Sequence, residues 1–203
     1  MSMYSYYTLY LFSYLLGSIP FGLLFVKWSG GGDIRDIGSG NIGTTNVLRT
    51  GSKKLAAATL LADALKGAIP VLFAQWIGMG EAAICGVATM AILGHVFPLW
   101  LGFKGGKGIA TALGCYLAIN PLVGLTCLLT WAVVAKVFRI SSLSALIAFF
   151  MAPLYMAVYG LCFEVTTKTD VIFMIIIYVV ILWTHRENIR RIIKGEESFI
   201  EKK

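Results

Sequence analysis

Charged residues are scarce in this 203-residue chain, at 13% of the sequence, whereas 58% is apolar or aromatic. Soluble globular domains carry roughly 25% charged residues, so a soluble globule of this length could not cover its surface with ionic groups. The shortage also excludes a disordered chain and a coiled coil, and it leaves a bilayer as the natural solvent. The surplus of +7 suits anionic headgroups or an anionic substrate better than nucleic acid, so no nucleic-acid partner is expected.

Cysteine and histidine are few as well. The four cysteines stand singly in apolar runs without a C-x-x-C pair, which predicts buried packing residues. Neither His95 nor His185 has the H-E-x-x-H spacing, so no metal or other cofactor is expected. Neither histidine has the Asp five positions later that many glycerolipid acyltransferases use, because Trp100 and Arg190 stand there. The G-x-S-x-G elbow of serine hydrolases is absent too.

Long uncharged runs, by contrast, are plentiful. A spanning helix needs about 20 apolar residues, and the runs predict an all-α integral membrane protein with a single domain over residues 1–203. The first run lacks the basic start of a signal peptide and is interpreted as a retained span. The predicted spans are residues 4–26, 55–79, 82–103, 109–119, 121–138, 142–163 and 169–186.

The run from residue 108 to 135 is either one tilted span or a hairpin broken at Asn120-Pro121. Positive residues prefer the cytoplasmic side. Outside Lys66, a single crossing divides the 16 remaining Lys and Arg evenly, whereas the hairpin places 15 on one side and Lys168 alone on the other. The arm 109–119 is about 16 Å long and reaches only partway through the bilayer. We therefore predict seven membrane helices, including short half-membrane helices in a broken hairpin, with the N-terminus outside and the C-terminus in the cytoplasm.

This topology gathers four polar segments at the cytoplasmic face, at residues 28–52, 102–108, 139–144 and 185–195. The first contains Gly38-Ser39-Gly40-Asn41-Ile42-Gly43-Thr44-Thr45-Asn46, followed by Arg49. Its glycines let backbone N–H groups converge, and its side chains add donors, among them a planar guanidinium suited to phosphate. An oxyanion site is the prediction, and a flexible connector is the alternative.

The second segment runs from Gly102 to Gly108 and leads directly into a helix N-terminus, which favours phosphate. It is not a P-loop, because no hydroxyl follows Lys107, so an ATPase is excluded. In the last segment, His185 and Asn188 share a face if the helix continues. The alternatives are headgroup anchoring for the lysines and an interfacial basic stretch after residue 185.

Three other features are less specific. Asp63 and Lys66 are costly inside a span, but their i, i+3 spacing permits mutual neutralisation, so a structural role is favoured. His95 is either a helix-end histidine or a neighbour of the site. The tail after Gly195 is expected to be dispensable.

Together, three motifs resemble one family over essentially the whole chain. They are Gly38 to Asn46 with Arg49, His95-Val96-Phe97-Pro98 with Phe103 to Thr111, and His185-Arg186-Glu187-Asn188-Ile189. They closely resemble the bacterial acyl-phosphate:glycerol-3-phosphate acyltransferase family, PlsY. The resemblance implies transfer of a fatty acyl group from acyl phosphate to the 1-hydroxyl of sn-glycerol 3-phosphate, giving lysophosphatidic acid and phosphate in phospholipid biosynthesis. It also implies a multi-pass protein of the bacterial inner membrane, in contact with membrane lipid, that makes no direct use of acyl-CoA or acyl carrier protein.

The resemblance further implies which residues act. Catalytic roles fall to Ser39, Arg49, Lys107 and His185. Substrate binding is assigned to Ser39, Asn41, Asn46, Arg49, Lys104, Gly105, Gly106, Lys107, Gly108, His185 and Asn188. The proton of the attacking hydroxyl passes either to the donor phosphate or to His185. A transporter or channel for small phosphorylated anions is the main alternative function, and a lipid-binding scaffold is a third.

Overall fold

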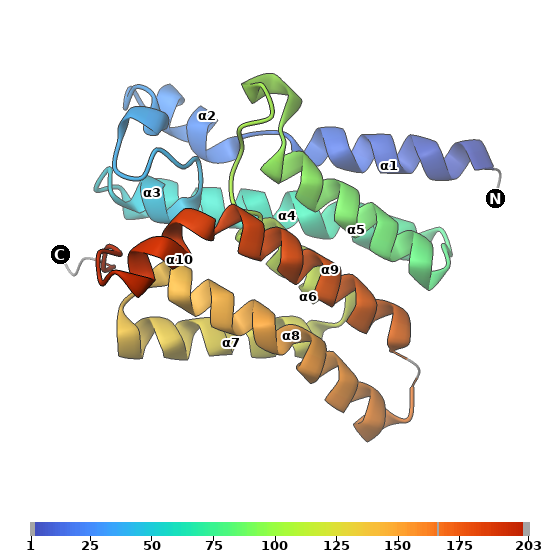
Figure 1. The fold of residues 1–203 in the computed structure, drawn as a ribbon. Helices are drawn as coiled ribbons and strands as arrows, with labels where there is room; N and C mark the ends of the chain where they lie inside the picture. The colour runs from blue at the N-terminus through green and yellow to red at the C-terminus, as the bar shows by residue number, and fades with distance from the viewer. Residues whose placement is uncertain (1–2, 166, 201–203) are drawn as a thin grey trace. The chain divides into compact units, whose positions relative to one another are not determined.

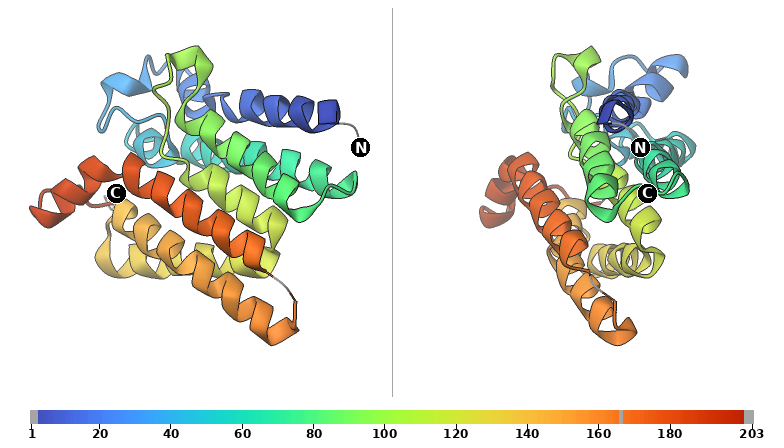
Figure 2. Two further views of the ribbon diagram at one scale, coloured as in Figure 1. Left: turned by 45° about the vertical axis from the view of Figure 1, so that its right-hand side comes forward. Right: turned by 90° about the vertical axis from the view of Figure 1, so that its right-hand side faces the viewer.

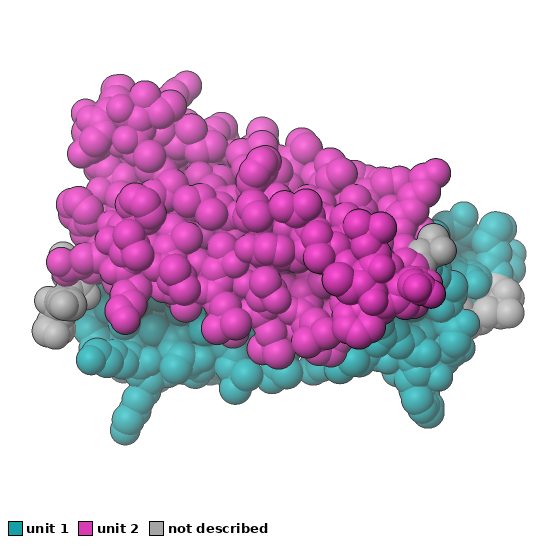
Figure 3. All heavy atoms as spheres, turned by 90° about the horizontal axis from the view of Figure 1, so that it is seen from below, with its two compact units in different colours: residues 1–115 teal, residues 116–203 magenta. Residues whose placement is uncertain are grey.

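The computed structural model describes residues 3–165 and 167–200, which form helices joined by turns and short loops, without a strand among them (Figure 1). The all-α prediction is therefore confirmed for the described chain. The chain divides into two compact units, residues 1–115 and 116–203, which Figure 3 colours separately.

The first unit is built around three long helices. Figures 1 and 2 show that α1 and α5 run in one direction and α4 in the opposite one. The polar segments that follow α2 and α5 consequently lie at the same end of this unit. Its elements are α1 (Met3–Gly17), α2 (Phe21–Trp28), η1 (Ile34–Asp36), α3 (Thr44–Leu48), α4 (Lys53–Trp76), α5 (Glu81–Val96), η2 (Leu99–Leu101) and the first part of α6 (Ile109–Ile119).

Glycines let these helices approach closely. A Cβ on Gly17 of α1 would lie 2.1 Å from the carbonyl oxygen of Ala91 in α5. On α6, a Cβ on Gly114 would lie 2.0 Å from the carbonyl oxygen of Ala64 in α4. Only glycine allows backbones to meet at such distances. The packing of α1 on α5 and of α4 on α6 therefore requires glycine at residues 17 and 114.

Two predicted spans are interrupted. The span predicted over residues 4–26 consists of α1 and α2, because helix α1 stops at Gly17 and Pro20 caps the next helix. The span predicted over 82–103 is helical only to Val96, and Pro98 then begins a short 3-10 turn. Both breaks lie beside the loops that carry the candidate site.

The second unit contains the remainder of α6 and four further helices. These are α7 (Pro121–Phe138), α8 (Ser141–Phe163), α9 (Lys168–Thr184) and α10 (Arg186–Ile193). The predicted break at Asn120-Pro121 is confirmed: the Asn120 side chain accepts a hydrogen bond from the Val123 amide at 3.2 Å, and Pro121 is the first helical residue. A Cβ on Gly124 would lie 2.7 Å from Cα of Leu117, so α7 folds back on α6.

Length and composition fit a multi-pass membrane protein. Among the described residues, five helical segments are long and apolar enough to cross a bilayer, or up to six if α9 and α10 count as one bent span. Helix α6, with 11 residues, is shorter. Large apolar side chains such as Leu61 on α4 (62% exposed) and Leu129 on α7 (64%) face outward, as on helices surrounded by lipid.

Candidate active site

The loop of residues 34–49, here called the Ser39 loop, is held by one buried side chain. The Asn46 amide nitrogen donates to the carbonyl oxygens of Ile34, Ile37 and Asn41 at 2.8–3.0 Å. Its oxygen accepts from the backbone N–H of Ser39 at 3.0 Å. Both ends of the amide are therefore engaged with the loop backbone. These hydrogen bonds favour a fixed loop over the flexible connector considered as an alternative.

Gly38 brings the guanidinium of Arg49 onto this loop. The glycine has φ of +56°, and a Cβ there would lie 2.5 Å from the Asn46 oxygen and 2.8 Å from Cδ of Arg49. A side chain at residue 38 would thus displace both neighbours. Ser39 and Arg49 are themselves exposed at the loop surface. Asn41 accepts from the Gly43 amide at 2.9 Å, an interaction that tightens the turn.

An ion pair that the sequence analysis missed lies at the start of the loop. Asp33 accepts hydrogen bonds from the backbone and the guanidinium of Arg35, both at 2.9 Å. These hydrogen bonds lower the pKa of Asp33 to about 2. Arg35 is thus compensated locally, whereas Arg49 has no carboxylate partner among the described residues, which leaves its charge for an anion.

The second loop, residues 102–108, here called the Lys107 loop, lies directly on the end of α5. The amides of Gly105 and Gly106 donate to the carbonyl oxygens of Val96 and His95, at 3.1 and 3.0 Å. A Cβ on Gly106 would lie 2.0 Å from Nε2 of His95, so this position accepts only glycine. Because these two amides are used within the protein, the start of α6, directly after the loop, is the place suited to phosphate.

The two loops share a hydrophobic base. Ile34, Ile42 and Val47 of the Ser39 loop belong to one buried cluster, and Leu101, just before the Lys107 loop, packs against it. Lys104 is exposed and Lys107 is half-buried. The structure therefore brings the predicted residues Ser39, Asn41, Asn46 and Arg49 into one loop, and Lys104 to Gly108 into a second loop anchored on the same core.

His185 and Asn188 lie at the junction of α9 and α10 in the second unit. The helix does not continue straight through them, because the axis turns by 65° at this point. Both side chains are buried, with 2% and 5% exposed. Nδ1 of His185 lies 2.9 Å from the carbonyl oxygen of Ile181, which can only accept, so Nδ1 carries the proton and Nε2 is the basic nitrogen of the neutral ring.

Glu197 anchors the tail, which the sequence predicts to be dispensable, to three side chains of the second unit. Its carboxylate accepts hydrogen bonds from Ser142 at 2.7 Å, from Arg191 at 2.6 Å and from the side-chain amide of Asn188. The backbone amide of Ile200 also donates to the carbonyl of Arg139. Burial raises the pKa of Glu197, but the hydrogen bonds from Ser142, Asn188 and Arg191 outweigh it and the net pKa is lowered.

No group of three or more His, Cys, Asp or Glu side chains is arranged to hold a metal ion in residues 3–165 and 167–200. Sequence reasoning missed Glu197 altogether. Its carboxylate, three positions after the basic run Arg186 to Lys194, was the signal that could have drawn attention to it.

Comparison with known proteins gives a consistent result. The glycerol-3-phosphate acyltransferase family model matches residues 7–195. The glycerol-3-phosphate acyltransferase of Agrobacterium fabrum is 51% identical over 193 residues, covering 95% of this chain and 91% of the relative. That of Rhodospirillum rubrum is 50% identical over 195 residues, covering 92% and 87%.

Two crystal structures of PlsY, an integral membrane glycerol 3-phosphate acyltransferase, are similar to this chain. The glycerol 3-phosphate form has a TM-score of 0.89 at 39% identity and covers 96% of this chain and 95% of its own. The lysophosphatidic acid form has a TM-score of 0.88 at 38% identity, with the same coverage.

Proposed function

The chain belongs to the glycerol-3-phosphate acyltransferase family and is an acyltransferase, and we propose that it moves a fatty acyl group from acyl phosphate to the 1-hydroxyl of sn-glycerol 3-phosphate. The products are lysophosphatidic acid and inorganic phosphate. The observation that carries this proposal is the pair of glycine-rich loops with Arg49 and Lys107 at one end of the first unit. It fits the glycerol 3-phosphate and lysophosphatidic acid forms of the related PlsY, since both molecules carry a phosphate monoester.

The proposal keeps the substrate-binding residues that the family resemblance implies. Ser39, Arg49, Lys107, His185 and Asn188 hold the phosphate of glycerol 3-phosphate. Asn46 and Asn41 act beside them by fixing the Ser39 loop, as their hydrogen bonds suggest. Residues 104–108 and the start of α6 also approach the acyl phosphate, for which a helix N-terminus is a favourable neighbour.

The chemistry needs little beyond positioning. The 1-hydroxyl oxygen attacks the acyl carbonyl carbon, the bond from that carbon to the phosphate oxygen breaks, and phosphate leaves with the electron pair. The hydroxyl proton passes to the departing phosphate, or in the rival route to Nε2 of His185. Phosphate is already a good leaving group, so holding donor and acceptor together supplies the main effect, while lysine and arginine stabilise the developing charge. No acyl-enzyme, acyl-CoA or acyl carrier protein takes part.

We place the enzyme in the bacterial inner membrane with seven membrane helices. The N-terminus lies outside, the C-terminus inside, and the active site faces the cytoplasm. The distribution of 15 positive residues on one side against Lys168 on the other supports this orientation. Successive membrane helices must cross in alternating directions in this topology. The directions of α1, α4 and α5 agree with that requirement, because α4 runs opposite to the other two.

Phosphate release tests the proposal. Purified protein in detergent is incubated with acyl phosphate, with and without glycerol 3-phosphate, and released phosphate and lysophosphatidic acid are measured. Release that depends on glycerol 3-phosphate is expected, and it should be abolished in a folded Lys107→Ala variant. Release without the acceptor would indicate hydrolysis instead. If no phosphate is released and phosphorylated anions are instead taken up into vesicles that contain the protein, a transporter is favoured. Transporters usually have their binding groups near the bilayer midplane.

A further inference from the structure

A buried polar cluster in the first unit connects the surroundings of both loops. Asp63 and Lys66 of α4 and His95 of α5 are each no more than 4% exposed. Nζ of Lys66 lies 2.8 Å from Oδ1 of Asp63, and Nδ1 of His95 lies 3.8 Å from the same oxygen. Asp63 and Lys66 neutralise each other, as their spacing predicts. Lys66 and His95 also make contacts that neutralisation does not require.

On one side the cluster reaches the break between α1 and α2. Nζ of Lys66 donates to the carbonyl oxygen of Ile19 at 2.7 Å and lies 5.6 Å from the ring centroid of Phe21. Helix α2 in turn rests on the Ser39 loop, because a Cβ on Gly22 would lie 2.0 Å from the carbonyl oxygen of Ile42. Lys66 therefore contacts the chain just before α2, the helix that packs on this loop.

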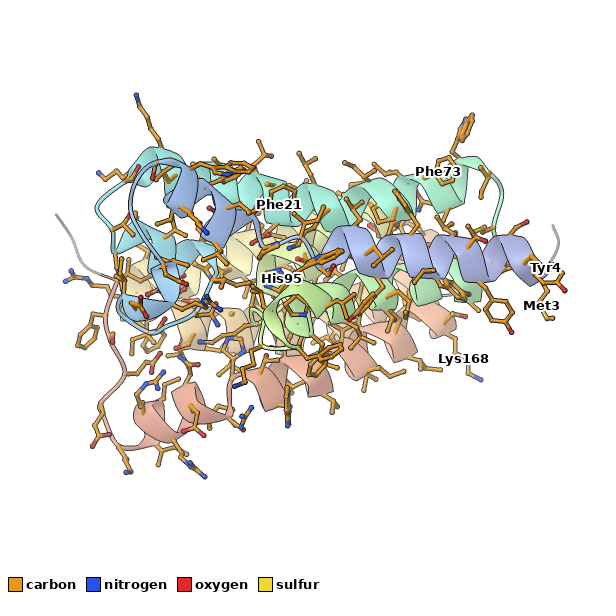
Figure 4. All side chains as sticks on the ribbon, turned by 90° about the horizontal axis from the view of Figure 1, so that it is seen from above. Met3, Tyr4, Phe21, Phe73, His95 and Lys168 are labelled. Atoms are coloured by element: carbon orange, nitrogen blue, oxygen red, sulfur yellow. The ribbon has the colours of Figure 1, made fainter. Side chains whose placement is uncertain are left out.

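On the other side the cluster reaches the Lys107 loop. The carbonyl of His95 accepts from the Gly106 amide at 3.0 Å, and its imidazole lies against the Cα of the same glycine. Figure 4 labels Phe21 and His95, which lie in the same part of the first unit, away from the Tyr4 and Phe73 end. A short chain of contacts thus runs from one loop to the other.

Burying an ion pair is expensive, particularly inside a membrane. Well-packed apolar residues of similar volume often stabilise a core as well or better, and an intramembrane charge pair commonly serves function. Apolar residues could fill this space, but they could not donate to the Ile19 carbonyl. The free-energy cost of burying this ion pair is consistent with a role in holding the Ile19 segment in place, beyond filling space in the core.

We propose that Asp63, Lys66 and His95 form a positioning cluster that fixes the Ser39 loop and the Lys107 loop relative to each other, and so sets the affinity of the site for phosphate-bearing substrates. The three residues act through the loops and do not touch substrate. This inference rests on the proposed function and extends it to residues outside the loops.

The test compares an unbalanced with a balanced substitution. Lys66→Met leaves the Asp63 carboxylate buried without its ammonium partner and should lower the melting temperature in detergent. The double variant Asp63→Asn with Lys66→Met removes both charges and should recover most of the melting temperature. Its KM for glycerol 3-phosphate should nevertheless stay raised, on the order of tenfold, because displacements of about 1 Å in a site cost up to a hundredfold. Thr59→Val is the matched control, since this buried hydroxyl donates only to its own helix, at Leu55.

Hydrogen exchange provides a readout that does not depend on turnover. Amides of Gly105 and Gly106 should exchange faster in the double variant than in Thr59→Val or the unaltered protein. If the double variant fails to fold, His95→Gln, which leaves the ion pair intact, should show the same faster exchange and raised KM. Unaltered KM values and unaltered hydrogen exchange in a folded double variant would overturn the inference. Mutual charge neutralisation would then be the only role of the Asp63–Lys66 pair. If the unaltered enzyme has no transferase activity, the proposed function fails, while exchange and stabilisation by inorganic phosphate still decide the cluster's role.

Discussion

The side-chain amide of Asn188 donates a hydrogen bond to the carboxylate of Glu197, nine residues further along the chain. The same carboxylate accepts from Ser142 at the start of α8 and from Arg191 on α10. An amide that donates to a fixed carboxylate is held in one orientation. Glu197 therefore determines how Asn188, one of the proposed phosphate-binding residues, presents its remaining atoms.

Glu197→Gln should destabilise the protein and impair the site. The variant replaces one acceptor oxygen by an NH2 group among three donors and removes the charge that strengthens these hydrogen bonds, at a cost of about 1–3 kcal/mol. We expect a melting temperature lower by a few degrees and a raised KM for glycerol 3-phosphate. Glu196→Gln is the matched control, because Glu196 is exposed. Equal behaviour of the two variants would mean that the tail contact has no part in function.

The tail contact should also depend on pH. The folded-state pKa of Glu197 is lowered from its ordinary value of 4.5. A lowered pKa stabilises the folded state above the ordinary value, and that contribution is lost as the pH falls through the lowered pKa. Melting temperatures measured from pH 7 down to pH 3 should therefore fall less steeply for Glu197→Gln than for the unaltered protein. Parallel curves would contradict this.

Arg49→Lys should weaken use of glycerol 3-phosphate although the charge is kept. A guanidinium can bind two phosphate oxygens in a planar fork, whereas an ammonium is a point charge on a flexible stem. We expect a rise in KM of about tenfold, in keeping with the loss of one charge-assisted hydrogen bond. Kinetics for both substrates provide the measurement. Lys53→Arg, on the exposed start of α4, is a control that should change neither value, and an unchanged KM in Arg49→Lys would refute a bidentate role.

Replacing all four cysteines by alanine should leave turnover largely intact. Cys85, Cys115 and Cys127 are buried, as the sequence predicts, whereas Cys162 at the end of α8 is exposed and does not fit that prediction. Each buried replacement should cost about 1 kcal/mol in stability, so the melting temperature falls while activity per folded molecule persists. Complete loss of activity in a folded variant would instead indicate an acyl-thioester intermediate.

The sequence predicts features that depend on local chemistry. The break at Asn120-Pro121 follows from a capping asparagine and a proline, and the composition of the Ser39 loop marks it as a turn-rich anion site. Contacts between residues far apart in the chain could not be predicted from the sequence. Glu197 meets Ser142, 55 positions away, and the tail therefore looked dispensable. Asn46 is predicted to bind substrate, and the structure adds that its amide holds the loop backbone. Residue type alone does not reveal where a side chain's hydrogen bonds go.

Gly106→Ala should disable the Lys107 loop. A Cβ at residue 106 would lie 2.0 Å from Nε2 and 2.8 Å from Cε1 of His95, and this imidazole is buried against Asp63 and cannot move aside cheaply. The loop must shift instead, which breaks the hydrogen bond from the Gly106 amide to the His95 carbonyl and moves the start of α6. We expect kcat/KM to fall on the order of a hundredfold, the usual consequence of a displacement of about 1 Å. Gly80→Ala is the control, since a Cβ there meets nothing within 4 Å and φ is −68°. Near-normal kinetics in a folded Gly106→Ala enzyme would show that the loop tolerates displacement and that its fixed position does not limit the reaction.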